Sequence, residues 1–314
     1  MARKTALALL LVALCLCTIA RADDTASHTL GLAVLGSGGP GATGRAGSAY
    51  LVLVDGKPRV LVDAGPGSFA RLGESGLSPA GVDTVLLTHL HIDHAGELPG
   101  FVKARAIAAR ADITFNIFGP AGAPGNRKAG DAAFPSTTRF VSQLFGPQGA
   151  FGYVGDFAGH ISFKPRDVKT SRPQRVLADG PLTVDAISGH HRDAPAVLYR
   201  VNLAGAGSVC FSGDIDAQGH AALSHLVQGC DLLVFNTVVL DPPQSPPILY
   251  TLHTPPGQIG ELAAKAGVGR LLLSHLSPTT DAAAPDIRAS IARSFSGPVE
   301  FAVDGMRVEV EGVK

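Results

Sequence analysis

The sequence predicts a layered α/β protein. Short apolar runs that alternate with glycine-rich turns are typical of strands, as in LGLAVLG at 30–36 and LLVF at 232–235. Segments with helical spacing lie between several of these runs, as in LPGFVKARAIAARA at 98–111. Strands that alternate with helices in this way favour sheets covered by helices over an all-β or all-α fold.

The composition is that of a folded protein with a sizeable core. Hydrophobic residues make up 46% of the 314 residues and charged residues 17%. The formal net charge is zero. A balanced charge predicts no strong overall attraction to nucleic acid.

The N-terminus has the pattern of a cleaved signal peptide. Arg3 and Lys4 precede the apolar run TALALLLVALCLCTIA, and ARA at 20–22 is a small-x-small cleavage signal. The sequence therefore predicts a signal peptide at 1–22 and an exported protein, periplasmic or secreted, with no membrane segment after cleavage. A single folded domain is expected over 28–314.

The first half of this domain shows a hairpin, a helix and a buried strand. SAYLVLV and RVLVDAG flank a turn at Asp55 and Gly56, which predicts a β-hairpin. SFARLGESG at 68–76 predicts a short helix that ends at glycine, and VDTVLLTH at 82–89 predicts a strand. The segment at about 118–169 is rich in Gly, Pro and Phe and is interpreted as an ordered insertion packed over one face.

Two cysteines remain after removal of the signal peptide. Cys210 and Cys230 each lie beside an apolar strand-like run. Two buried thiols are the favoured interpretation, and a disulfide is the alternative that export would permit. Their separation is not the CxxC spacing of a metal or redox pair.

The segment THLHIDHAGE, at 88–97, has the pattern of a metal site. His89 and His91 are two residues apart, so in an extended segment both point the same way and could bind one ion. Asp93 and His94 follow as the chain turns, and they aim elsewhere. One segment could thus supply ligands to two adjacent ions, for which imidazole and carboxylate are suitable ligands.

HLHIDH resembles the His-x-His-x-Asp-His signature of the metallo-β-lactamase superfamily. LGSGGP and VLVDAGPG resemble that superfamily's opening strands, and FSGDID resembles its strand-end aspartate. HHRDAPAVLYRV, at 190–201, resembles the third-histidine segment of its ribonuclease Z, arylsulfatase and class II phosphodiesterase branch. HTPPGQIGELAAKAGVGRLLLSHLSP resembles the last segment, with an auxiliary histidine and the final ligand. The resemblance covers nearly all of the chain after the signal peptide. It implies an αββα sandwich of two mixed β-sheets flanked by helices.

The resemblance also implies a binuclear site for two Zn²⁺, with Mn²⁺ or Fe as alternatives. The implied ligands are His89, His91 and His191 for one ion, Asp93, His94 and His275 for the other, and Asp214 as the bridge. His190 competes with His191, and the distance to Pro195 and Tyr199 favours His191. Asn236 departs from the family pattern, because relatives often have a glutamate there.

The implied function is that of an exported binuclear zinc hydrolase that acts on a small phosphodiester or related ester through a metal-activated hydroxide. Asp93 would orient the nucleophile while also binding metal. His253 would stabilise the transition state or protonate the leaving oxygen. The alternative role for His253 is to cap the helix that starts near Pro255.

A small-molecule ester is the expected substrate. An arylsulfatase or a lactonase on the same metal core is the alternative, as is a non-catalytic metal-binding protein. Processing of tRNA is disfavoured, because export would separate the enzyme from tRNA and the sequence has no arm rich in Lys and Arg. No nucleic-acid polymer is therefore expected as a partner, and a homodimer is left open.

Overall fold

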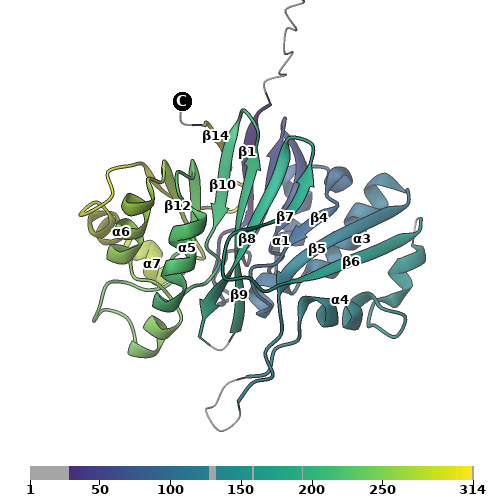
Figure 1. Cartoon of the computed structure of the whole chain (residues 1–314), viewed down its shortest axis with the longest axis horizontal. Coiled ribbons are helices and arrows are strands. Elements are labelled where there is room, and N and C mark those ends of the chain that lie inside the picture. The colour runs from purple at the N-terminus through teal and green to yellow at the C-terminus, as the bar shows by residue number, and fades with distance from the viewer. Residues whose placement is uncertain (1–27, 127–131, 158, 193, 313–314) are drawn as a thin grey trace, which may run out of the picture.

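The structure is a computed structural model that describes residues 28–126, 132–157, 159–192 and 194–312. The predicted signal peptide at 1–22 lies outside the described residues. Two β-sheets face one another, and helices cover the outer side of each, as Figure 1 shows. The predicted αββα sandwich of mixed sheets is confirmed.

The first sheet has seven strands in the order β14-β1-β2-β3-β4-β5-β6. The strands are β1 (Leu30–Gly36), β2 (Ala49–Val54), β3 (Lys57–Val62), β4 (Thr84–Leu86), β5 (Ile113–Pro120), β6 (Ile161–Val168) and β14 (Arg307–Val310). From β14 to β3 neighbouring strands are antiparallel, and from β3 to β6 they are parallel. The carboxyl ends of β3, β4, β5 and β6 therefore meet at one edge of the sheet.

The second sheet has the same plan, with the order β13-β12-β11-β10-β9-β8-β7. The strands are β7 (Gln174–Asp179), β8 (Leu182–His191), β9 (Ala194–Leu203), β10 (Gly207–Phe211), β11 (Leu232–Asn236), β12 (Arg270–Ser274) and β13 (Val299–Phe301). From β7 to β10 neighbours are antiparallel, and from β10 to β13 they are parallel. Its parallel strands thus also share one end.

Helices form the two outer layers. The α-helices are α1 (Ser68–Ser75), α2 (Ile92–Ala95), α3 (Leu98–Ala109), α4 (Thr137–Phe145), α5 (His220–Leu226), α6 (Pro256–Ala266), α7 (Pro278–Ala282) and α8 (Ala284–Ile291). Short 3₁₀ turns are η1 (Pro79–Gly81), η2 (Gly152–Asp156), η3 (Ala217–Gly219) and η4 (Pro247–Thr251). In Figure 1, α3 and α4 lie on the side of the first sheet, and α5 and α6 lie on the side of the second.

Three apolar cores correspond to the three interfaces between layers. The central core lies between the sheets and includes Val52, Val62, Tyr199 and Phe211. A second core joins the first sheet to α1, α3 and α4, and a third joins the second sheet to α5, α6 and α8. Burial on both faces explains why most strand sequences are continuous apolar runs and do not alternate.

The hairpin and most strands lie where the sequence predicts them. Asp55 and Gly56 form the turn between β2 and β3 with φ of 52° and 73°, as the turn residues require. β4 is shorter than the predicted strand and ends at Leu86, before the histidines. β6 was not predicted, because its sequence ISFKPRDV has charged residues and Pro165. β6 is an edge strand, where a missing N–H costs no ladder bond.

The segment at 118–169 supplies strands and helices to the first sheet and to the helical layer that covers it. It contains the end of β5, α4, η2 and β6, and an excursion bridged by Ala123 and Phe134 lies between β5 and α4. Phe145 stacks on Phe163, with ring centroids 4.6 Å apart, which packs α4 against β6. Whether the segment is an insertion relative to other proteins stays a prediction.

Cys210 and Cys230 are joined in a disulfide. Cys210 lies in β10, Cys230 lies two residues before the start of β11, and both are fully buried. The sequence favoured two buried thiols, so the alternative was the right one. Parallel pairing of β10 with β11 brings the two side chains together, which two separate apolar runs do not reveal.

Candidate metal centre

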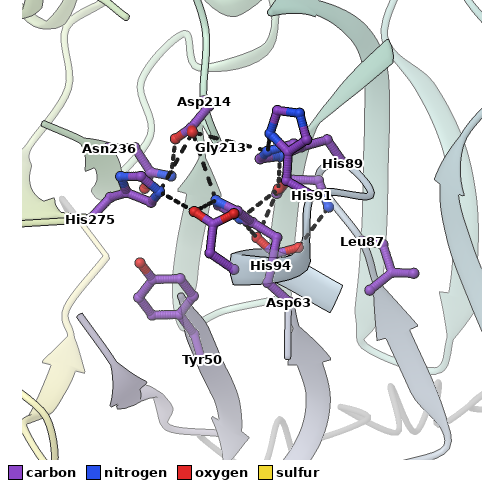
Figure 2. Close-up of polar contacts among 12 residues, drawn as sticks. Tyr50, Asp63, Leu87, His89, His91, His94, Gly213, Asp214, Asn236 and His275 are labelled. Atoms are coloured by element: carbon purple, nitrogen blue, oxygen red, sulfur yellow. Dashed lines mark hydrogen bonds and ion pairs between the residues drawn. The ribbon is translucent and has the colours of Figure 1, made fainter. Parts of the chain in front are cut away.

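The predicted ligands gather at one end of both sheets. Figure 2 shows five of them: His89, His91, His94, Asp214 and His275. His89 and His91 follow β4, Asp214 follows β10, and His275 follows β12. These strands belong to the parallel half of each sheet, so their carboxyl ends face the same opening. The apolar strand sequence ends and polar residues begin at this edge, because here the chain leaves the dry core.

The first group consists of His89, His91 and His191, whose ligand atoms lie within 4.8 Å of one another. The Nε2 atom of His89 is 3.0 Å from the Nδ1 atom of His91. The Nδ1 atom of His191 donates a hydrogen bond of 2.9 Å to the backbone oxygen of Leu252. This bond leaves Nε2 of His191 as the free ring nitrogen that faces the group.

The second group consists of Asp93, His94 and His275. Asp93 and His94 belong to α2, which begins directly after His91 and turns the chain toward the second sheet. The Oδ2 atom of Asp93 is 3.2 Å from Nε2 of His275 and 3.7 Å from Nε2 of His94. Nε2 of His94 is buried and has no hydrogen-bond partner in the described structure. A buried polar atom without a partner is uncommon, and here it is aimed between carboxylates.

Asp214 lies between the two groups. Its Oδ2 atom lies within 4.0 Å of a ring nitrogen of five histidines, at 3.5 Å from His275, 3.8 Å from His94, 3.8 Å from His191, 3.9 Å from His253 and 4.0 Å from His89. The carboxylate is buried. Burial disfavours its charge, but the surrounding imidazoles, led by that of His275, outweigh burial and hold the pKa of Asp214 well below its usual range.

Asn236 fixes the orientation of this carboxylate. Its Nδ2 atom donates a hydrogen bond of 2.7 Å to Oδ1 of Asp214, and both side chains are buried. Oδ2 is therefore the oxygen that faces the histidines. An ionised glutamate at this position could not donate such a bond. The departure from the family pattern thus provides a neutral donor for Asp214.

Asp63 supports the second group from behind and was not identified as a site residue from the sequence. It follows β3 and accepts 2.8 Å from Nδ1 of His94, 2.7 Å from the Thr88 backbone N–H and 2.7 Å from the Thr88 hydroxyl. Burial disfavours a charged His94, but Asp63 more than offsets it and raises the pKa of His94 to about 9. The signal in the sequence was the aspartate that ends VLVDAGPG.

His190 and His191 take different directions. His191 is 3% exposed and belongs to the first group. His190 is partly exposed, and its Nδ1 atom lies 2.7 Å from Oδ2 of Asp216. Adjacent residues of a strand point to opposite faces, so only one of the two can join the metal group. The structure places His191 there.

His253 lies at the border of both groups. Its Nδ1 atom is 3.9 Å from Oδ2 of Asp214 and is buried with no hydrogen-bond partner in the described structure. Burial lowers its pKa to about 4, so its neutral form prevails at pH 7. α6 has no side-chain cap, so the alternative role of His253 as the cap is not what the structure shows.

The donor set fits a divalent metal. Imidazole nitrogens and carboxylate oxygens converge from two sheets, are buried, and leave ring nitrogens without partners. Histidines coordinate in the neutral form, and burial lowers the pKa of His89 well below its usual range. The His and Asp clusters therefore indicate a divalent metal site whose metal the donors alone do not identify. Fold and site together define a metal-dependent hydrolase.

The chain belongs to the metallo-beta-lactamase superfamily. The family model of that description matches residues 42–244. Ribonuclease Z of Mycobacterium avium (strain 104) is 31% identical over 290 residues, which cover 88% of this chain and 97% of that protein. Ribonuclease Z of Mycobacterium marinum is 31% identical over 292 residues, covering 89% of this chain and 98% of that protein.

Solved structures share the fold. The short form of human tRNase Z has a TM-score of 0.67 at 20% identity, with 89% of this chain and 99% of that chain covered. The metallo-beta-lactamase fold protein YhfI from Bacillus subtilis has a TM-score of 0.66 at 21% identity, with 90% of this chain and 99% of that chain covered.

Three predictions made from the sequence are wrong against these relatives. Small-ester hydrolysis and the absence of a nucleic-acid partner are overturned, because the relatives that match along most of the chain are named ribonucleases. Export is overturned with them, since an exported enzyme would be separated from RNA. The net charge of zero had argued against a nucleic-acid partner, but the net charge of a chain does not show where its cations gather on the surface. Among the residues that the structure describes, no helix is long and apolar enough for a membrane span.

Proposed function

We propose that this chain is a metal-dependent ribonuclease that hydrolyses phosphodiester bonds of RNA. The observation that carries the proposal is the pair of His and Asp groups that share Asp214, in a chain 31% identical to ribonuclease Z over 88% of its length. Shared ligands at one opening suit in-line displacement at a phosphate, where charge develops on both sides of the phosphorus. The described residues contain both groups in full.

In this proposal the ligands are those that the sequence analysis named. His89, His91 and His191 would hold one ion, Asp93, His94 and His275 the other, and Oδ2 of Asp214 both. Imidazole with carboxylate suits zinc, and Mn²⁺ or Fe would also fit such donors. The ions, when bound, would lower the pKa of a water toward ~7 and offset charge on the phosphate.

Two side chains act on the reacting groups in this proposal. Asp93 is partly exposed at the opening, so its carboxylate can accept a hydrogen bond from the attacking water and orient it. The water oxygen bonds to phosphorus, the bond to the leaving nucleoside oxygen breaks, and that oxygen takes a proton. His253 carries one N–H in its neutral form and can donate to the phosphate or to the leaving oxygen.

A row of exposed cations supports an RNA substrate, and one of them, Arg166, also lies over the ring of Phe118. The residues are exposed, lie on β6 and on the segment after it, and make no ion pair with any residue that the structure describes: Lys164, Arg166, Lys169 and Arg172. Thr170 donates its N–H to the Ser188 hydroxyl of β8 at 3.0 Å, three residues before His191. The row thus leads along the sandwich edge to the metal centre. Cations in such a row suit the phosphates of a strand.

The proposal is tested with a 3′-extended tRNA transcript and a single-stranded RNA, each incubated with protein loaded with Zn²⁺ or Mn²⁺. Cleavage of at least one RNA is expected, and DNA of the same sequence serves as the comparison. Asp214→Ala should abolish cleavage, because it removes the oxygen common to both groups.

Contaminating nucleases are excluded by this inactive variant, purified in the same way. If the metal-loaded protein hydrolyses bis(p-nitrophenyl) phosphate but leaves both RNAs intact, the proposal of a ribonuclease is wrong. If it hydrolyses neither, the proposal of catalysis is wrong.

A further inference from the structure

An open cavity of about 370 Å³ lies beside the metal centre. Its lining includes His190, Arg192, Asp216, Gln218, Tyr250 and Thr251. The cavity is next to the centre along two chain segments. His190 precedes the proposed ligand His191, and Thr251 precedes Leu252, whose oxygen accepts from His191.

Asp216 organises the wall of this cavity. Its side chain is 5% exposed, and Oδ2 accepts both from His190 Nδ1, at 2.7 Å, and from the Arg192 N–H, at 2.9 Å. Oδ1 accepts from the Gln218 N–H at 2.8 Å. An ionised carboxylate only accepts, so Nδ1 of His190 carries the hydrogen and Nε2 is left for another partner. One buried carboxylate therefore fixes three parts of the cavity.

Arg192 brings a cation to the same cavity. It occupies the turn between β8 and β9 with φ of 51°, a backbone conformation that residues other than glycine rarely adopt. Its N–H bond to Asp216 holds the backbone there. The exposed guanidinium makes no ion pair with any residue that the structure describes, and it lines the cavity. A fixed turn with an unpaired guanidinium is suited to an anion that arrives from outside.

The lining as a whole fits a nucleotide. Arg192 matches a phosphate, Nε2 of His190 can accept from a ribose hydroxyl, and the Tyr250 ring offers a flat face. The Tyr250 hydroxyl is already used, because it accepts from the Ser245 N–H at 2.9 Å. A small apolar ligand would leave most of these polar groups without a partner.

We propose that this cavity is a nucleotide subsite, which binds the nucleotide next to the scissile phosphate of an RNA substrate. The inference rests on the proposed ribonuclease function. His190 and His191 point to opposite faces of β8, so the cavity lies across the strand end from the metal centre. Only a substrate that continues beyond the scissile group can occupy both. Arg192 and His190 thus select a polynucleotide over a small phosphodiester.

The test compares kinetics on RNA with kinetics on bis(p-nitrophenyl) phosphate, which is too short to reach the cavity. For Arg192→Ala the loss of kcat/KM should be roughly tenfold larger on RNA than on the small ester, and it should come from KM, because a charge-assisted hydrogen bond is lost. His190→Ala should show the same preference and should keep the metal content of the wild type. Arg192→Lys should recover part of the affinity for RNA, because lysine keeps the positive charge but cannot form the two parallel hydrogen bonds of a guanidinium group.

Two further readouts separate binding from structure. Arg192→Ala should flatten the dependence of log KM for RNA on log salt by about 0.7, the value for one phosphate contact on a single strand. RNAs shortened to one nucleoside on either side of the cleaved bond locate the subsite. On the RNA that lacks the nucleotide bound in the cavity, kcat/KM of the wild type should fall roughly tenfold below its value on the longer RNA. For Arg192→Ala, kcat/KM should be the same on the shortened RNA as on the longer RNA.

Lys57→Ala is the matched control, because Lys57 is an exposed cation at the opposite end of β3 from the metal centre. This substitution should leave kcat/KM unchanged on both RNA and the small ester. Equal losses on RNA and on the small ester, or an unchanged KM for RNA in Arg192→Ala, would overturn the subsite while leaving the ribonuclease in place. A wild type that does not cleave RNA would overturn both.

Discussion

Replacing Asp63 with asparagine tests how much the residues behind the metal centre contribute. Asp63 is 1% exposed and accepts hydrogen bonds from Nδ1 of His94, from the Thr88 N–H and from the Thr88 hydroxyl. The asparagine side chain has nearly the same shape as aspartate but only one acceptor oxygen. The NH₂ group of the asparagine would face hydrogen-bond donors of His94 or Thr88, so at least one of these buried donors would lose its acceptor.

The size of the effect follows from this loss. Removing one partner of a buried, charge-assisted pair costs about 3 kcal/mol. Free energy lost in the folded state corresponds to a lower Tm by about 5–10 °C for a chain of this length. The same change frees the His94 ring to rotate, and weakening such a support typically lowers metal affinity roughly 10–100-fold.

The assay is competition with a graded series of chelators, together with thermal unfolding of the stripped protein. Asp179→Asn is the matched control, because Asp179 pairs with Arg59 and is 57% exposed at the surface, where such pairs contribute little. A metal affinity for Asp63→Asn within twofold of the wild type would refute the argument that Asp63 orients His94.

Four further outcomes are expected. Protein purified without chelator should approach two metal equivalents per chain by elemental analysis, and a stable value of one after zinc is supplied would contradict two joined sites. His253→Ala should keep both metals and slow RNA cleavage by roughly 10²–10⁴-fold, but slow a p-nitrophenyl ester far less, because p-nitrophenolate leaves without a proton; equal slowing would exclude leaving-group protonation. Replacing Lys169 and Arg172 together with alanine should raise KM for RNA and reduce its salt dependence, and an unaltered slope would remove the cationic row from the RNA path. Chelator-stripped protein should lose stability in urea as pH rises from about 6.5 to 9.5. The pKa of His94 is raised to about 9 in the folded state, so its pairing with Asp63 is fully present below the unfolded value of about 6.5 and is lost as pH rises through about 9. A flat profile would contradict that pairing.

The sequence predicted those parts of the site that depend on neighbours along the chain. HLHIDH places four side chains within six residues, and two-residue spacing sets which of them point together, so the metal pattern needs little tertiary information. Apolar runs that end in Asp214 or His275 similarly indicate polar groups at strand ends. Continuous burial on both faces made most of the central strands evident, although β5 was not predicted. The edge strands β6, β7, β13 and β14 were also missed, because exposure allows edge strands charged residues and proline.

Tertiary structure decided what depends on chain segments that meet from afar. Asp63 and His94 are 31 residues apart, and Asn236 and Asp214 are 22 apart, so only strand pairing shows that they form hydrogen bonds. Strand pairing likewise brings Cys210 and Cys230 together in a disulfide. Charge gives another example: composition determines a net charge of zero, but the fold decides that exposed cations without an ion pair among the described residues gather on β6 and the segment after it. Burial, direction and distance between such groups are properties of the folded chain, because each depends on which strands become neighbours.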